Sequence, residues 1–191
     1  GYNAPNESRY NQFLYFGRLS MWQKGLDLIV GGVKLASAEL RAARFKVILA
    51  GRVNELELLA LQQELEKLDI TDIVTILPNV TNEKRLELYR KSRYFIHPSR
   101  IEGFARSMRD ALSAGLPMIT TLDSNAGNLI ADYDAGIVCE TSSNGVASAI
   151  ENLVNCTLEQ EHNLRRNVEK LVNENNTERY KAFWNGVYAS L

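Results

Sequence analysis

Two cations lie at the two ends of a short loop near the start of the chain, and together they could hold a phosphate group. Arg18 follows Gly17 at the end of an apolar run, and Lys24 precedes Gly25, where a helical pattern begins. Two cations and the free N–H groups at a helix start could bind a diphosphate without a metal ion. Spacing alone also fits two solvated loop residues, which is the simpler interpretation.

A second group of candidate residues lies in the segment 99–121, which has the pattern of a loop, a helix and a strand. We expect the backbone N–H groups of the first helical turn to bind phosphate, and this turn contains Phe104, Ala105, Arg106 and Ser107. Arg106 would add a cation there, although an outward, solvated arginine fits equally well. Gly115 and Pro117 end the helix, because both residues are favoured just beyond helix C-termini.

Two carboxylates of the same segment could bind sugar hydroxyls. Glu102 precedes the helix, and Asp110 lies within it. A carboxylate suits a pair of neighbouring hydroxyls, because each of its oxygens can accept a hydrogen bond. Glu102 could instead interact with the helix dipole, and Asp110 could be a plain exposed helix residue. His97, at the end of the strand before this segment, fits a packed strand residue better than a catalytic one.

The elements around these residues alternate between strands and helices. We expect strands at 13–16, 45–50, 73–77, 94–97, 118–121 and 136–139. We expect helices at 26–36, 54–68, 82–91, 104–115, 143–155, 158–173 and 177–189. This alternation predicts an α/β fold with a Rossmann-like parallel sheet covered by helices on both faces. Both candidate groups would then lie at the carboxyl edge of the sheet, where open α/β sheets bind their ligands.

Three ordered blocks resemble the group 1 family of retaining GT-B glycosyltransferases. Residues 17–28 contain G-R-L followed by K-G-L-D-L, similar to the G-R-L…K-G-x-D-x-L block of the family. Residues 102–117 contain E-G-F, D-A and A-G-x-P, similar to the E-x7-E region of the family. Residues 125–128 match a position where the family commonly has G-G-x-P-E. The resemblance extends from about Phe13 to Val154 and implies the C-terminal, donor-binding half of a GT-B fold.

The same resemblance implies a role for each candidate residue. The catalytic residues would be Glu102, at the donor sugar near its C3 hydroxyl, and Arg18 and Lys24, at the donor diphosphate. Asp110 would bind the ribose hydroxyls, although the family has a glutamate there, and Asn128 also replaces a glutamate. The implied substrate-binding residues are Gly17, Asn79, Val80, Phe104, Ala105, Arg106, Ser107, Asp110 and Asn128; Asn79 and Val80 would lie by the nucleobase.

Composition bears on the class of protein, its compartment and its possible partners. The 191 residues include 45% hydrophobic and 24% charged residues, which fits a globular domain with a sizeable core. A net charge of −1 gives no electrostatic case for nucleic acid. Two cysteines do not make a disulfide framework and favour a reduced, cytoplasmic compartment. With two histidines and scattered cysteines, we expect no metal site and no cofactor besides the donor itself.

We expect three segments: a linker remnant at 1–11, a nucleotide-sugar-binding domain at 12–175, and a C-terminal helix at 176–191 that crosses toward an absent N-terminal, acceptor-binding domain. The implied reaction is metal-independent, retaining transfer of a glycosyl unit to an acceptor hydroxyl, in polysaccharide, lipid-linked glycan or glycoconjugate synthesis. The whole protein would be cytoplasmic or peripheral at the inner face of the membrane. Two alternatives remain: a nucleotide-sugar-binding module without activity, and a GT-B-type sugar-nucleotide epimerase.

Overall fold

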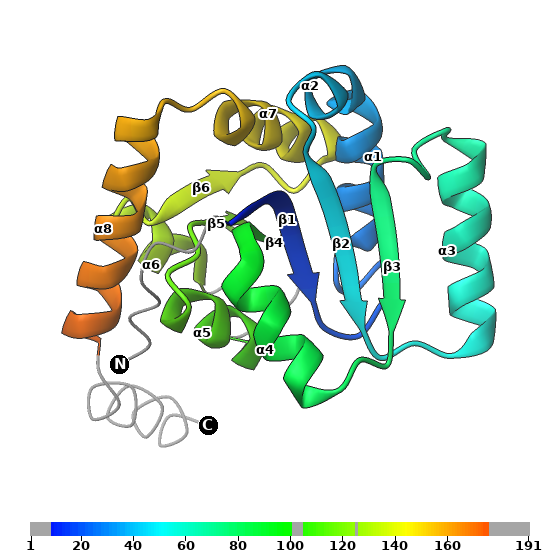
Figure 1. Ribbon diagram of the computed structural model, residues 1–191, viewed down its shortest axis with the longest axis horizontal. Helices are drawn as coiled ribbons and strands as arrows, with labels where there is room; N and C mark the ends of the chain where they lie inside the picture. The colour runs from blue at the N-terminus through cyan, green and yellow to red at the C-terminus, as the bar shows by residue number, and fades with distance from the viewer. Residues whose placement is uncertain (1–8, 101–104, 125, 176–191) are drawn as a thin grey trace.

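The described residues form one six-stranded, fully parallel sheet with the strand order β3-β2-β1-β4-β5-β6 (Figure 1). The computed structural model describes residues 9–100, 105–124 and 126–175. The strands are β1 (Tyr10–Phe16), β2 (Lys46–Gly51), β3 (Val74–Pro78), β4 (Ser92–His97), β5 (Met118–Thr121) and β6 (Gly136–Cys139). From β1 the chain first adds strands on one side, β2 and β3, and then adds β4, β5 and β6 on the other side. Doubly wound nucleotide-binding folds have the same change of side.

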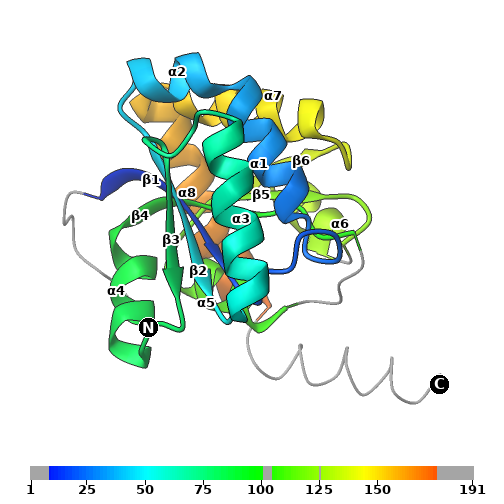
Figure 2. The same ribbon diagram turned by 90° about the vertical axis from the view of Figure 1, so that its right-hand side faces the viewer.

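Helices cover both faces of the sheet, and α1 and α4 lie on opposite sides of the strands in Figure 2. The described helices are α1 (Leu26–Leu35), α2 (Ser37–Ala42), α3 (Glu55–Lys67), α4 (Asn82–Lys91), α5 (Arg106–Ser113), α6 (Ala126–Asp132), α7 (Ser143–Val154) and α8 (Leu158–Glu174). Alternate strand residues point to opposite faces. Phe13 and Tyr15 therefore pack in a core with α1, α3 and α7, whereas Leu14 packs with α4, α5, α6 and α8.

The structure confirms the predicted α/β sheet and all six strands, with shifts at several ends. β1 begins at Tyr10, so Tyr10 and Asn11 belong to the sheet although we had expected them in a linker. Two helices were not predicted. The segment expected as one helix at 26–36 continues after Ala36 into the short α2, and the Asn- and Gly-rich stretch near 126 forms α6. The helix predicted at 177–189 lies outside the described residues.

Local sequence signals explain where several elements begin and end. The Thr81 side chain accepts a hydrogen bond from the Lys84 N–H and caps α4. Gly115, with φ of 72°, ends α5, and the Leu116 N–H donates to the Ala111 carbonyl at 3.0 Å. This left-handed C-terminal glycine is the predicted helix stop. It allows the chain to enter β5 directly beside β4.

Candidate functional site at the carboxyl edge of the sheet

The candidate site lies where the carboxyl ends of β1 and β4 meet. The two strands are hydrogen-bonded neighbours, and Leu14 is paired with Phe95. The chain leaves β1 toward α1 on one face, whereas α5, which follows β4, packs on the other face. Helices that leave adjacent strands on opposite faces open a crevice between the two loops, which is the usual ligand position in such sheets.

The loop that follows β1 is fixed against the end of β2. The Gly17 N–H donates to the Ala50 carbonyl at 3.0 Å, and the Leu19 N–H donates to the Arg52 carbonyl at 2.8 Å. The approach is so close that a Cβ atom on Gly51 would lie 1.7 Å from the Gly17 carbonyl oxygen. Gly51 also has φ of 142°, a conformation that suits glycine. The backbone around Gly17 is therefore held in place before any ligand binds.

The structure brings the two predicted cations together on this loop. Arg18 is exposed, and its Nη2 donates to Gln23 Oε1 at 2.5 Å. Lys24, the next residue after Gln23, is half-buried. The Tyr15 hydroxyl donates to the Arg18 carbonyl at 2.8 Å and fixes the backbone under the guanidinium. Arg18 thus contacts the residue next to Lys24, in the loop that leads into α1.

The start of α1 is pressed against the end of β4. Gly25 is the N-cap residue, with φ of 68° and no side-chain capping hydrogen bond. A Cβ atom on Gly25 would lie 2.0 Å from the Pro98 carbonyl oxygen. Only glycine fits this left-handed, crowded position without strain. The sequence placed Gly25 at the start of a helix, and the structure gives the physical reason for glycine at this position.

The first turn of α5 also begins without a side-chain cap. Ala105 is the N-cap residue, Arg106 is exposed, and Ser107 is half-buried. A helix start without a capping side chain presents N–H groups to an anion. The Ser107 carbonyl accepts a hydrogen bond from the Tyr89 hydroxyl at 3.2 Å. Burial and the Asp110 carboxylate raise the pKa of Tyr89, which keeps this phenol protonated as a donor.

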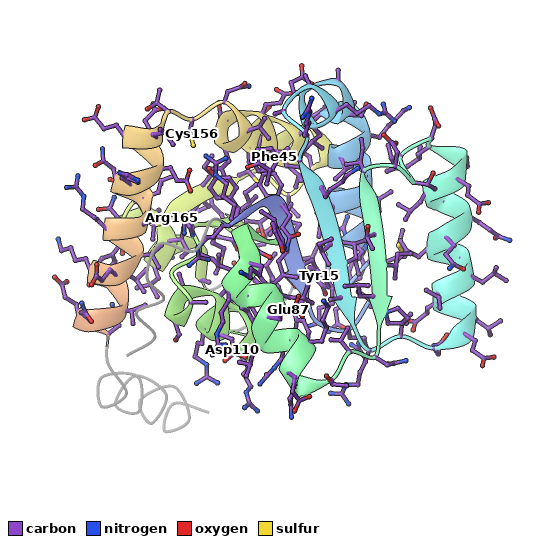
Figure 3. All side chains as sticks on the ribbon, in the orientation of Figure 1. Tyr15, Phe45, Glu87, Asp110, Cys156 and Arg165 are labelled. Carbon is purple, nitrogen blue, oxygen red and sulfur yellow. The ribbon has the colours of Figure 1, made fainter. Side chains whose placement is uncertain are left out.

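Asp110 has a partner that the sequence did not reveal. Arg85 of α4 reaches across to it, with 3.1 Å between Arg85 Nη1 and Asp110 Oδ2 (Figure 3 shows Asp110 on α5 beside α4). The Arg85 side chain is 22% exposed, and that of Asp110 is 34% exposed. The Arg85 Nε atom is buried without a hydrogen-bond partner. Asp110 therefore presents one carboxylate oxygen that Arg85 does not hold.

A second unpredicted arginine links the two loops of the site. Arg100, beyond the end of β4, forms a bidentate ion pair with Asp27 in the first turn of α1, at 2.8 and 2.7 Å. It also donates to the Trp22 carbonyl at 2.7 Å. The hydrogen bonds with Asp27 raise the pKa of Arg100 above its ordinary value. The proximity of Arg100 and Asp27 depends on the fold, because 73 residues separate them.

Three more of the predicted residues lie on two other segments, the turn after β3 and α6. Asn79, with φ of 50°, donates its N–H to the Gly51 carbonyl at 2.8 Å, which places the turn with Val80 beside the Gly17 backbone. Asn128 is exposed on α6. Thr121 Oγ1 donates to the Ser99 carbonyl at 2.9 Å and joins the ends of β5 and β4.

Glu102 and Phe104 lie outside the described residues, so their predicted contacts stay predictions. His97 is 1% exposed, and its ring stacks between Tyr15 and Phe95 at centroid distances of 5.7 and 6.0 Å. This packing agrees with the interpretation of His97 as a buried strand residue. Within the described ranges, no group of three or more His, Cys, Asp or Glu residues could hold a metal ion.

Comparison with known proteins identifies the family. The family model described as "Glycosyl transferases group 1" matches residues 3–171. The chain belongs to the group 1 glycosyltransferase family. Its six parallel strands and two helical layers correspond to one Rossmann-like half of the GT-B glycosyltransferase fold.

Among curated relatives of this family member, a GDP-mannose:cellobiosyl-diphosphopolyprenol alpha-mannosyltransferase of Xanthomonas oryzae pv. oryzae is 31% identical over 103 residues. The match covers 54% of this chain and 26% of the relative. The chain thus spans about a quarter of the length of this mannosyltransferase. In the part of the chain that the structure describes, no helix is long and apolar enough to cross a bilayer.

Two solved structures share the fold of this group 1 protein at low sequence identity. A UDP-forming alpha,alpha-trehalose-phosphate synthase of Burkholderia xenovorans has a TM-score of 0.77 and 12% identity, over 94% of this chain and 44% of that one. The HepE protein of Anabaena, solved in complex with UDP and glucose, has a TM-score of 0.73 and 17% identity, over 95% of this chain and 48% of that one.

Proposed function

We propose that this chain is the donor-binding part of a glycosyltransferase that takes its glycosyl unit from a nucleoside diphosphate sugar. The observation that carries the proposal is the loop between β1 and α1. This loop holds Arg18 and Lys24 at the carboxyl edge of the sheet, beside the uncapped start of α1. The family membership supplies the reaction class, and the HepE complex with UDP and glucose supports the ligand class.

In this proposal the diphosphate leaving group is stabilised by charge. Arg18 and Lys24 would contact its oxygens, and the N–H groups of Arg106 and Ser107 would approach from the start of α5. Each hydrogen bond to a charged group contributes about 1.5–3 kcal/mol. Such fixed donors act without a metal ion, and they stabilise the charge that develops as the bond to the sugar breaks.

The ends of the donor would meet the other residues of the site. Asp110 would accept ribose hydroxyls, and the backbone of Asn79 and Val80 would lie beside the base. Asn128, and Glu102 in the segment that the structure does not describe, would face the sugar. Transfer with retained configuration to an acceptor hydroxyl would need the acceptor-binding part of the protein. We propose that this acceptor-binding part corresponds to the region of the related proteins that this chain does not match.

Thermal unfolding with and without ligand tests the proposal. We expect uridine, guanosine or adenosine diphosphate to stabilise the chain in the presence of a chelator. At a concentration of 100 times the dissociation constant, the gain is about 2.7 kcal/mol. Stabilisation that requires added magnesium or manganese would contradict the metal-free site. No stabilisation by any of the three diphosphates would contradict donor binding itself.

A further inference from the structure

Three contacts fasten the loop before α1 to the segment that follows β4. Ser99 Oγ donates to the Gln23 carbonyl at 3.1 Å, and Gly25 is packed against the Pro98 carbonyl. Arg100 Nη1 donates to the Trp22 carbonyl at 2.7 Å. The backbone on both sides of Lys24 is therefore fixed by residues 98–100, although the loop belongs to a different part of the sequence.

Arg100 makes further contacts with the start of α1 and with the Trp22 ring. Its two terminal nitrogens bind the two carboxylate oxygens of Asp27, and its guanidinium lies 5.5 Å from the centre of the Trp22 ring. The Arg100 side chain is 19% exposed. Trp22 is 62% exposed, so the guanidinium covers part of a ring that is otherwise open to solvent. A bidentate pair of this kind fixes the geometry of both partners.

The pair also controls the charge at the start of α1. Asp27 is the acidic residue in the first turn of α1, close to the position where a diphosphate would bind. An unpaired carboxylate at that position would repel an anionic ligand. Arg100 neutralises this carboxylate and leaves Arg18 and Lys24 to attract the diphosphate.

From this geometry we propose that Arg100 is a positioning residue for diphosphate binding. It holds the loop 22–25 in its binding conformation and cancels the charge of Asp27, without contacting the ligand itself. The inference rests on the proposed donor-binding function. It adds that diphosphate binding depends on residues 98–100, which follow β4, as well as on the loop before α1.

The test compares three single variants by calorimetry, with a nucleoside diphosphate and the matching nucleoside as ligands. We expect Arg100→Ala to lower the affinity for the diphosphate by about tenfold, which corresponds to 1.4 kcal/mol. The affinity for the nucleoside should stay within about twofold of the wild-type value. Arg100→Lys keeps the charge but loses the bidentate fork, and should fall between Arg100→Ala and the wild type. Arg41→Ala is the matched control, because Arg41 forms a similar bidentate pair with Asp72, at the amino end of β3. It should bind like the wild type.

Two further measurements separate the mechanism from general damage. Amide hydrogen exchange of ligand-free Arg100→Ala should be faster in residues 19–26 and unchanged around Arg41, whereas unchanged exchange in the loop would overturn the positioning role. Adding Asp27→Asn to Arg100→Ala removes the exposed carboxylate and should recover part of the lost affinity. If the double variant binds no better than Arg100→Ala, the electrostatic part of the proposal is wrong.

The outcomes also distinguish this inference from the proposed function. If the wild type binds no nucleoside diphosphate, the proposed function fails and the role of Arg100 in diphosphate binding fails with it. Hydrogen exchange then tests only whether Arg100 holds the loop 22–25 in place. If the wild type binds and Arg100→Ala binds equally well, the proposed function stands and the inference is overturned. If Arg100→Ala does not fold, Arg100→Lys carries the same comparison, because lysine keeps the charge on a long side chain and loses the bidentate fork.

Discussion

The pair formed by Arg85 and Asp110 gives a prediction whose sign depends directly on the structure. If a ribose hydroxyl takes the position of Arg85 at Asp110 Oδ2, the ligand displaces a hydrogen bond of 3.1 Å from Arg85 Nη1. The two side chains are 22% and 34% exposed, so solvent screens their attraction. An ion pair of this exposure contributes about 0.2–1 kcal/mol. Arg85→Ala removes that competition.

We therefore expect Arg85→Ala to raise the affinity for a nucleoside by a factor of about 1.4 to 5, from the same 0.2–1 kcal/mol. The affinity for inorganic pyrophosphate should stay unchanged, because the proposed function assigns this pair to the ribose and not to the diphosphate. Titration calorimetry with both ligands makes the comparison, and Lys84→Ala is the control, because Lys84 pairs with Glu87 on the same helix. A tenfold loss of nucleoside affinity in Arg85→Ala would refute the reasoning and show that Arg85 orients Asp110 or binds the ligand.

Three further predictions concern other parts of the fold. Asp110→Ala should lower the affinities for a nucleoside and for its diphosphate by similar factors in calorimetry. An unchanged nucleoside affinity would exclude Asp110 from the site. Gly25→Ala should lower stability in urea by more than about 1 kcal/mol, because alanine is strained at positive φ and its Cβ would meet the Pro98 carbonyl; equal midpoints would contradict this. Burial opposes the ionisation of Glu161, yet hydrogen bonds from Arg93 and Arg165 hold the pKa of Glu161 below its ordinary value. The stability from this lowered pKa is present above the unfolded-state pKa and is lost as pH falls through the folded one. Glu161→Gln should thus cost about 1.5–3 kcal/mol at pH 7 and less in acid, whereas a pH-independent cost in urea denaturation would contradict the ion-pair account.

Residues that are near in sequence made most of the fold predictable. The run Phe45–Ala50 is almost wholly apolar, so its place as a buried strand follows from composition. The stop at Gly115 followed in the same way from helix-terminus preferences. The stretch that forms α6 was missed because glycine and asparagine favour turns. In the structure, Gly127 lets this helix approach the carbonyl of Thr121, where a Cβ atom would lie 2.6 Å away.

The candidate site was predictable only in part. Arg18 and Lys24 could be placed at one sheet edge, because local motifs and the strand pattern fix their positions. The partners of Asp110 and Asp27 could not be found this way. Arg85 is 25 residues from Asp110, and Arg100 is 73 residues from Asp27. Such pairs depend on how helices from different strands approach each other, which local periodicity does not encode.

The central claim is that Lys24 and Arg18 hold the diphosphate of a nucleotide donor at the carboxyl edge of β1. The most direct measurement is calorimetry of the wild type and Lys24→Ala in a chelating buffer, with a nucleoside diphosphate and the bare nucleoside. The loss of one charge-assisted hydrogen bond is worth about 1.5–3 kcal/mol, so Lys24→Ala should weaken the diphosphate by about 10- to 150-fold and leave the nucleoside unchanged. Equal affinity of Lys24→Ala and the wild type for the diphosphate would contradict the claim.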